Sequence, residues 1–575
     1  MPPEVCYRAW TAPLRVARRR SHHPGPDAQR THTINLSGPD GRDLSVYCYS
    51  SELLLRGDAL IVQPHINPTT GDTLCWNGEA SFPMYPQISI RENDGARLFA
   101  ALGALPDPAL IPTILGKVEG PYALAYFHNG SRRLFFGRDP LGRRSLLMHA
   151  PTKQAPYFFL SSASAGERVG YEVAELDTHC FYELDLGALL GATDFICVQR
   201  RTGSHCLQAI PARVNRTLPS ESERPFVTSL DEIPPQLSSA VDGLISRLDR
   251  SVRLRIENIP KNVSLDKGQL AVLFSGGIDS TVITFLAHRH VPLDEPIDLL
   301  NVAFENPRKI QVKRQGNVGG MPKRERRALM IAEKDNLAAN RSDQEADYLV
   351  PDRETGLQQV EELRRLCPER QWNFVEINVP FAEAQVAREE VEAFMWPRRT
   401  VMDLSLAMAL FFAARGVGQV RDNTSHPYQP YKSPAKVLLN GLGSDELLGG
   451  YGRHRAAYKT GGWQGVVDEL QLEIDRIPSR NMGRDDRVIS SHGKETRHPF
   501  LSLDVVAFLA GLPVNFKMDP RLDVGLGDKM LLRLAARKLG LLEASIRKKR
   551  AMQFGSHSAR MENGTPNAGG ELLLK

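Results

Sequence analysis

Residues 271–281, Ala-Val-Leu-Phe-Ser-Gly-Gly-Ile-Asp-Ser-Thr, limit the possible folds more than any other segment of the chain. Apolar residues typical of a buried strand lead into a Ser-Gly-Gly turn, and a helix-like stretch follows over residues 280–287. A strand, a glycine turn and a helix N-terminus form an anion site, because free N–H groups and the helix dipole both favour negative charge. Gly276 and Gly277 let the backbone approach a phosphate chain. The segment therefore predicts an α/β domain that binds a phosphorylated ligand.

This turn differs from a Walker A loop, because no lysine stands at the helix start and an aspartate, Asp279, lies in the turn instead. A carboxylate beside phosphates repels them unless a cation intervenes, so we expect Mg²⁺ as the bridge. The hydroxyls of Ser275 and Ser280 can donate hydrogen bonds to the same ligand. The run Ser-Gly-Gly-x-Asp-Ser resembles the pyrophosphate loop of enzymes that split ATP between its α and β phosphates. An ordinary strand–turn–helix connection is the alternative.

Length and composition indicate a soluble protein of two or three domains, since 575 residues exceed what one core holds. The net charge of only +5 does not point to nucleic acid, and the sequence has no apolar run of 18 residues, so we expect no membrane contact. Seven scattered cysteines without a Cys-x-x-Cys pair disfavour a zinc site or a disulfide framework. We predict a cytoplasmic protein; the oligomeric state stays open.

The order of predicted elements divides the chain into segments. Short β-like runs broken by Gly, Pro and Asn indicate a layered β-rich domain, and a second domain alternates strands with helices, which favours a parallel sheet. The predicted segments are an atypical N-terminus (1–30), the β-rich domain (31–197), a linker (198–235), the α/β domain (236–560) and a flexible tail (561–575).

Individual elements follow from the apolar spacing. Strands are expected in the first domain at 59–63, 73–76, 122–127, 133–136, 157–160 and 180–184, and in the second near 271–274, 298–304, 372–379 and 436–440. Helices are expected near 237–252, 279–289, 355–367, 402–415, 464–475 and 528–539. A basic stretch within 306–347 is interpreted as a solvated insert rather than a nucleic-acid contact, and 416–435 as a surface loop.

A second motif follows another predicted strand: residues 437–451 read Val-Leu-Leu-Asn-Gly-Leu-Gly-Ser-Asp-Glu-Leu-Leu-Gly-Gly-Tyr. If both strands belong to one parallel sheet, Asp445 lies near the first loop at the carboxyl edge. Asp279 and Asp445 could then share one Mg²⁺ with the phosphate oxygens of the ligand.

With these motifs the chain resembles asparagine synthetase, and more closely the asparagine synthetase domain-containing proteins, a divergent eukaryotic branch. The segments that carry the resemblance are 275–280, 372–378, 401–405, 441–451, 483–489, 493–501, 529–533 and 550–555. The resemblance implies that aspartate attacks the α-phosphate of ATP, that pyrophosphate leaves, and that ammonia then displaces AMP to form asparagine. It assigns Lys529 as the catalytic lysine that stabilises the charge on the phosphates. The ATP-binding residues that it implies are Ser275, Gly276, Gly277, Asp279, Ser280 and Gly443, with Mg²⁺ on Asp279 and Asp445.

The chain departs from the family pattern Gly-Glu-Gly-Ser-Asp-Glu, because Leu442 stands where the glutamate is expected. That glutamate is expected to assist the attack of ammonia, and leucine cannot take a proton. A nucleotide-binding interaction protein without full catalysis is therefore the second hypothesis. A tRNA-modifying enzyme is a third, supported only by the basic stretch 308–327.

The first domain resembles a class II glutamine amidotransferase domain, which implies an α+β fold of the N-terminal-nucleophile (Ntn) type. The resemblance implies that Asn77 and Gly78 form an oxyanion hole, that Arg56 binds the glutamine carboxylate and that Asp94 holds its amine. These glutaminases use an N-terminal cysteine, whereas this sequence opens Met-Pro-Pro-Glu-Val-Cys6. From this opening we expect no glutamine hydrolysis. The small-molecule partners that the resemblance implies are aspartate and either glutamine or ammonia.

Overall fold

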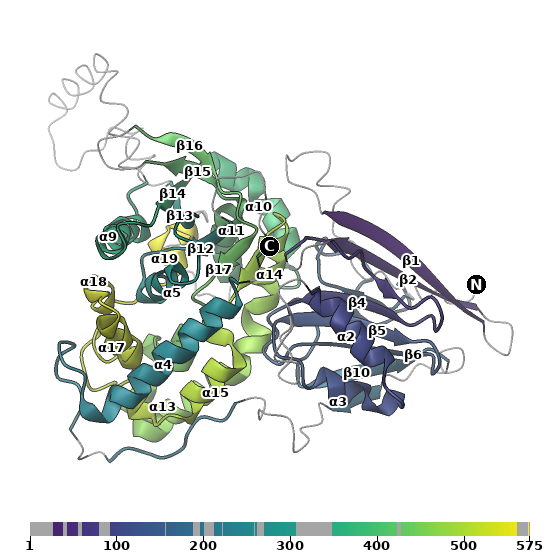
Figure 1. Ribbon diagram of the computed structural model, residues 1–575, viewed down its shortest axis with the longest axis horizontal. Helices are drawn as coiled ribbons and strands as arrows, with labels where there is room; N and C mark the ends of the chain where they lie inside the picture. Colours follow the sequence, from purple (N-terminus) through teal and green to yellow (C-terminus); the bar gives the residue numbers. More distant parts are fainter. Residues whose placement is uncertain are drawn as a thin grey trace.

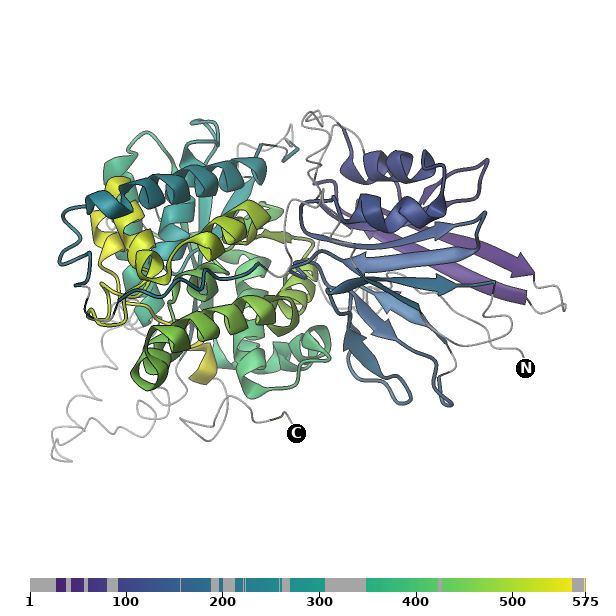
Figure 2. The same cartoon turned by 90° about the horizontal axis from the view of Figure 1, so that it is seen from below.

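Two layered parts make up the chain in the computed structural model (Figure 1). The structure describes residues 27–37, 43–55, 60–79, 92–155, 157–187, 196–199, 212–220, 222, 224–257, 259–260, 269–305, 348–421, 427–560 and 573. The purple and blue elements form the N-terminal part, and the teal to yellow elements form the C-terminal part beside it (Figure 2). Within the described residues, no helix has both the length and the apolar character needed to cross a membrane. The predicted insert 306–347, Cys6 and Arg56 lie outside the described residues.

The N-terminal part is built from three antiparallel sheets and a helical layer. A six-stranded sheet has the order β11-β10-β6-β5-β4-β3, a three-stranded sheet the order β8-β7-β9, and β1 pairs with β2. The strands are β1 (Ala28–Ser37), β2 (Asp43–Glu52), β3 (His65–Ile66), β4 (Thr73–Gly78), β5 (Tyr122–His128), β6 (Arg133–Arg138), β7 (Leu147–His149), β8 (Phe159–Ser161), β9 (Val173–Glu175), β10 (Cys180–Asp185) and β11 (Ile196–Gln199). The helices are α2 (Asp94–Gly103), η1 (Pro108–Leu110) and α3 (Ile111–Leu115).

Alternation along β5 explains this layering, because successive side chains of a strand point to opposite faces. Ala123, Ala125 and Phe127 share a core with residues of β1, β2 and β8. The side chains between them, such as Tyr122 and Leu124, pack against α2 and α3. The central sheet is therefore buried on both faces, as expected for a layered β-rich domain.

The C-terminal part is organised around a seven-stranded sheet of order β16-β15-β14-β13-β12-β17-β18. Its strands are β12 (Leu270–Leu273), β13 (Ile297–Phe304), β14 (Trp372–Val379), β15 (Val417–Val420), β16 (Gln429–Lys432), β17 (Val437–Leu439) and β18 (Glu495–Arg497). From β14 to β18 neighbouring strands are parallel, and β15 and β16 add an antiparallel edge. The sheet reverses its strand order around β12, and in such folds ligands bind at the carboxyl ends of the strands beside that point.

Helices cover both faces of this sheet (Figure 1). Leu270 and Val272 pack into a core with α4, α5, α13 and α17, whereas Ala271 and Leu273 pack into a second core with α10 and α11. The helices are α4 (Pro235–Leu254), α5 (Ile278–His288), α9 (Pro351–Leu366), α10 (Phe381–Met395), α11 (Val401–Arg415), α12 (Ser444–Leu448), α13 (Gly452–Arg480), α14 (Met482–Ser490), η3 (Pro499–Leu501), α15 (Leu503–Gly511), α16 (Val514–Lys517), α17 (Met530–Lys538), α18 (Leu542–Ser545), α19 (Met552–Gly555) and η4 (Ser558–Arg560).

Three sequence-based expectations differ from the structure. Residues 60–63 of the predicted strand 59–63 form no strand, because the backbone N–H of Gln63 donates to the Glu52 carboxylate and its carbonyl accepts from Ser50. The predicted loop 416–435 contains the hairpin of β15 and β16, whose edge position tolerates Pro430. The helix predicted near 464–475 extends over the whole of α13, which bends at Gly462.

The segment predicted as a linker, 198–235, is anchored where the structure describes it. Val214 is buried, its N–H donates to the side chain of Gln471 in α13, and the N–H of Asn215 donates to a carbonyl of α15. Residues 212–216 therefore belong to the packed surface of the C-terminal part.

Candidate functional site

The first glycine turn connects β12 to α5 and lies against the start of α9. Gly276 has a φ of +75°, and a Cβ there would lie 2.5 Å from the backbone nitrogen of Gly356. The hydroxyl of Thr355 donates to the carbonyl of Ser275 over 2.9 Å. The hydroxyl of Ser280 donates to the carbonyl of Gly277 over 3.0 Å, so it helps to shape the turn. Glycine is required at position 276 because two backbone segments meet there.

The second glycine turn follows β17, the parallel neighbour of β12 in the sheet. A Cβ on Gly441 would lie 2.9 Å from the Cβ of Asp279, so the two turns are in direct contact. Gly443 has a φ of +103° and precedes α12, which begins at Ser444. The shared carboxyl edge of β12 and β17 therefore brings the two sequence motifs together.

Lys529 joins these two turns. Its Nζ lies 2.6 Å from Oδ2 of Asp279 and 2.7 Å from Oδ1 of Asp445. The same Nζ donates to the hydroxyl of Ser444 over 3.1 Å. Lys529 stands immediately before α17, only 1% of its side chain is exposed, and its φ is +51°. A non-glycine residue with this backbone geometry is uncommon and indicates that the surrounding structure holds the lysine in place.

A second lysine, Lys549, was not predicted from the sequence. Its Nζ contacts Oδ2 of Asp445 and lies 4.9 Å from the centre of the Tyr451 ring. The signal for it was the basic run Arg547-Lys-Lys-Arg550, which directly precedes the family-like segment 550–555. Two lysines thus contact the same aspartate from different parts of the chain.

Electrostatic coupling keeps this cluster charged. Burial disfavours the ammonium of Lys529, but the carboxylates of Asp279 and Asp445 outweigh it and raise the pKa of Lys529. Burial likewise opposes ionisation of Asp445, yet Lys529 and Lys549 hold the pKa of this carboxyl well below its usual range. The site therefore contains two carboxylates and two ammonium groups within one small volume.

The donor set fits a hard divalent cation. Oδ1 of Asp279 is buried and has no hydrogen-bond partner, and Oδ1 of Asp445 has no hydrogen-bond partner besides its ion-pair contact with Lys529. Carboxylate oxygens are the ligands that Mg²⁺ uses together with phosphate oxygens. Asp279 and Asp445 would hold Mg²⁺, which would neutralise phosphate charge when bound.

The described residues that were predicted to bind glutamine lie near the carboxyl end of β4. The amide of Asn77 donates to the hydroxyl of Ser162 over 3.5 Å, and a Cβ on Gly78 would lie 2.6 Å from the carbonyl oxygen of Pro121. Asp94 is buried at the start of α2. A Cβ on Gly95, the next residue, would lie 2.9 Å from the indole of Trp76, so the start of α2 adjoins this end of β4.

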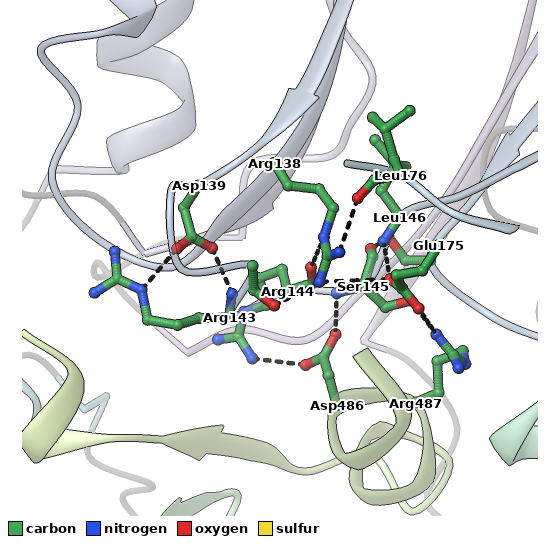
Figure 3. A network of polar contacts seen from close by, with 12 residues as sticks. Arg138, Asp139, Arg143, Arg144, Ser145, Leu146, Glu175, Leu176, Asp486 and Arg487 are labelled. Atoms are coloured by element: carbon green, nitrogen blue, oxygen red, sulfur yellow. Dashed lines mark hydrogen bonds and ion pairs between the residues drawn. The ribbon is translucent and has the colours of Figure 1, made fainter. Parts of the chain in front are cut away.

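A buried network of charges connects the N-terminal part to the C-terminal part (Figure 3). Arg144 lies 2.9 Å from Asp486 and also contacts Glu495, while Arg487 lies 2.5 Å from Glu175. Burial would raise the pKa of Glu175, but Arg487 and Arg138 outweigh it and lower this pKa to about 2. Arg487 and Glu175 therefore join the two parts as an ion pair, whereas burial raises the pKa of the Asp486 carboxyl in spite of Arg144.

The predicted glutamine site also reaches this interface. Glu79 directly follows Asn77 and Gly78, and it lies 3.0 Å from Arg497 of β18. Arg497 is 1% exposed and donates to the carbonyl of Arg255 over 2.6 Å. Arg533 similarly donates to Asp528 and to the carbonyls of Ser545 and Arg547 at and after the end of α18. Both arginines therefore have structural partners within the fold.

The fold and the site define an asparagine synthetase-like protein, and comparison with known proteins agrees. The asparagine synthase family model matches residues 252–328 and 458–568. The chain is 35% identical to asparagine synthetase domain-containing protein 1 of Gallus gallus, covering 95% of this chain and 94% of that protein. It is 33% identical to asparagine synthetase domain-containing protein YML096W of Saccharomyces cerevisiae, covering 91% and 86%. The chain belongs to the family of asparagine synthetase domain-containing proteins.

Among solved structures, a glutamine phosphoribosylpyrophosphate amidotransferase from B. subtilis matches 43% of this chain and 49% of its own. The TM-score of 0.19 and the identity of 12% are too low to support a conclusion about the fold.

Proposed function

We propose that this protein is an ATP-dependent amide-forming ligase of the asparagine synthetase type. The β-carboxylate of aspartate attacks the α-phosphate of ATP, pyrophosphate leaves, and nitrogen from ammonia or glutamine then displaces AMP to give asparagine. The observation that carries the proposal is the position of Lys529, between Asp279 and Asp445 at the carboxyl edge of β12 and β17. A buried cation at this point stabilises charge that develops on the phosphates, which is a large term in such reactions.

In this reaction the two glycine turns would bind the phosphates of ATP. Gly276 and Gly443 allow the tight packing that shapes these turns, and the N-terminus of α5 favours the negative charge. Lys529 and Lys549 would exchange their carboxylate partners for phosphate oxygens, while Asp279 and Asp445 take Mg²⁺. Each lysine and each aspartate keeps a partner of opposite charge in this exchange, so none of them is left unpaired.

The second candidate is a nucleotide-binding interaction protein that forms no amide, and Leu442 favours it. Aspartate-dependent exchange of ³²P-pyrophosphate into ATP distinguishes the two candidates. The ligase proposal predicts exchange that needs both aspartate and Mg²⁺. ATP binding by calorimetry without any exchange would support the second candidate instead.

The glutamine-dependent version of the reaction depends on the N-terminal part. Asn77, Gly78 and Asp94 support a glutamine site there, with Arg56 as the proposed carboxylate ligand. In keeping with the expectation that glutamine is not hydrolysed, we propose free ammonium as the direct nitrogen donor. Glutaminase assays on the full chain and on the Asn77→Ala variant test this part separately.

A further inference from the structure

The second glycine turn is attached to the sheet through Asn440, the residue that follows β17. The backbone N–H of Asn440 donates to the carbonyl of Arg497 in β18 over 2.9 Å, and its side-chain Oδ1 accepts from the N–H of Leu442 over 3.0 Å. Asn440 is buried, so both bonds are costly to break. The same turn leads into α12, whose first two residues contact Lys529. The course of this turn therefore depends on the position of β18.

The strand β18 is short and is the last in the order of the seven-stranded sheet. It contains three residues, all buried, and each of them pairs with one residue of β17. Side chains of the N-terminal part reach all three. Arg144 contacts Glu495 and donates to the carbonyl of Thr496 over 3.5 Å. Glu79 lies 3.0 Å from the Nε of Arg497. The position of β18 thus depends on the N-terminal part as well as on β17.

Glu79 supplies negative charge that Arg497 needs. Glu495 also pairs with Arg497, over 2.7 Å, but the other oxygen of Glu495 contacts Arg144, so one carboxylate serves two arginines. Arg497 also donates to a neutral group, the carbonyl of Arg255. Only 1% of Arg497 is exposed, and a buried charge without enough opposite charge is strongly unfavourable. Glu79 therefore helps to hold Arg497 in place.

Glu79 is itself fixed by the central sheet of the N-terminal part. It directly follows β4, and its backbone N–H donates to the carbonyl of Pro121 over 2.9 Å. Its side chain is 11% exposed, so the ion pair with Arg497 is largely shielded from water. This contact joins the end of β4 to the edge of the seven-stranded sheet.

We propose that Glu79 is a positioning residue for the reaction with ATP, acting through Arg497 and Asn440 on the second glycine turn. This inference rests on the proposed function and deepens it, because it gives the N-terminal part a role in the ATP half of the reaction that needs no glutamine. Loss of Glu79 moves Arg497, releases the N–H of Asn440 and shifts Asp445 relative to Lys529. A displacement of about 1 Å that starts far from the reacting atoms can slow a reaction about 100-fold.

The test uses the full-length protein and measures aspartate-dependent pyrophosphate exchange together with the Kd of MgATP. Rates are expressed per nucleotide-binding site, so a loss of folded protein does not enter them. In Glu79→Ala and in Asn440→Ala exchange falls about 10- to 100-fold. Glu79→Gln loses less than Glu79→Ala, because its amide oxygen still accepts from Arg497.

The double variant Glu79→Ala/Asn440→Ala shows whether the two residues act in one path. If Glu79 acts through Asn440, exchange in the double variant equals that of Asn440→Ala alone, because the link is already broken. Independent effects would multiply instead. If Glu79→Ala does not fold, Glu79→Asp replaces it in the same comparison, since its shorter side chain withdraws the carboxylate from Arg497.

Glu183→Ala is the matched control. Glu183 lies on β10, pairs with Arg133 of β6 over 2.7 Å, and its side chain is 11% exposed, the same fraction as for Glu79. The pair joins two strands inside the N-terminal part. Glu183→Ala therefore keeps the wild-type exchange rate and the wild-type Kd of MgATP.

The outcomes separate this inference from the proposed function. Multiplying effects in the double variant, or undiminished exchange in folded Glu79→Ala, overturn the positioning role and leave the ligase proposal intact. A wild-type protein that binds MgATP without any exchange contradicts the ligase proposal, and the Kd of MgATP then decides the positioning role. A several-fold weaker Kd in Glu79→Ala, with no further loss in the double variant, supports it, and an unchanged Kd overturns it. A wild-type protein that binds no MgATP overturns both.

Discussion

The ammonium group of Lys529 lies 2.6 Å from a carboxylate oxygen of Asp279, although 250 positions separate the two residues in the sequence. Asp279 is fixed by the start of α5, and Lys529 by the backbone bond from its N–H to the carbonyl of Leu448 in α12. Three distant segments therefore meet at one cation. This meeting point is where the proposed chemistry is most sensitive to substitution.

Replacement of Lys529 tests the proposed function directly. In Lys529→Ala the aspartate-dependent pyrophosphate exchange is expected to fall about 100- to 1,000-fold, because one preorganised donor to the developing charge is lost. Lys459→Ala, which removes an exposed lysine of α13, is the control and keeps the wild-type rate. A folded Lys529→Ala protein with undiminished exchange would contradict the role of Lys529.

Lys549 is expected to contribute to nucleotide binding rather than to overall stability. Lys549→Ala weakens MgATP binding about tenfold, roughly the 1.5 kcal/mol of one hydrogen bond to a charged group. Isothermal titration calorimetry measures the change. Lys548→Ala provides the comparison, since Lys548 is the exposed neighbour in the same basic run, and equal losses in both variants would argue against a specific contact.

Gly276 is expected to tolerate no side chain. In Gly276→Ala the added Cβ meets backbone atoms of Thr355 and Gly356 at 2.5 Å and the φ of +75° is strained, so stability falls by about 1–3 kcal/mol. Chemical denaturation measures the loss. Gly461→Ala serves as control because no heavy atom lies within 4 Å of its Cβ, and a similar loss there would contradict this explanation.

The buried ion network is expected to contribute most of the free energy that holds the N-terminal and C-terminal parts together. Arg144→Met leaves Asp486 buried without its cation, while Glu495 keeps Arg497, and the loss costs about 3–5 kcal/mol. Calorimetry should then resolve two unfolding transitions in place of coupled unfolding. Arg216→Met breaks an exposed pair with Asp468 and costs at most about 1 kcal/mol, so an equal effect would contradict the importance of burial.

Asp352 provides a pH-dependent prediction. Burial raises its pKa from 3.8 to about 7, although Arg550 and Lys549 oppose the shift. Folding therefore favours the protonated form, so this stabilisation is complete below pH 3.8 and is lost as the pH rises to about 7. Between about pH 5 and pH 8 the melting temperature should fall less in Asp352→Asn than in the wild type. Identical slopes would contradict the shift.

The elements that could be predicted from the sequence are those whose secondary structure is determined by their own residues rather than by tertiary contacts. The apolar run 271–274 followed by two glycines predicted β12, its turn and α5, because burial and turn geometry are local properties. The hairpin of β15 and β16 was missed because Gly418 and Pro430 are typical of loops, and only the free edge of β14 makes a strand possible there.

The candidate site was predicted only in part for a similar reason. Asp279, Asp445 and Lys529 lie in segments that resemble the family, so their roles were inferred before the structure. The part played by Lys549 depends on a tertiary contact between the segment after α18 and Asp445 of α12. A basic run such as 547–550 is otherwise indistinguishable from a solvated loop.

The ion network of Figure 3 has a consequence for truncation of this protein. Asp486, Arg487 and Glu495 have counter-ions that come from the N-terminal part, and burial makes each of these partners hard to replace. The N-terminal part thus acts as a structural subunit within the chain, independent of any glutamine chemistry. A shortened protein that starts at α4 would expose this face to solvent and would leave Asp486 and Arg487 without these counter-ions. Its solubility would then depend on substitutions that remove the unpaired charges.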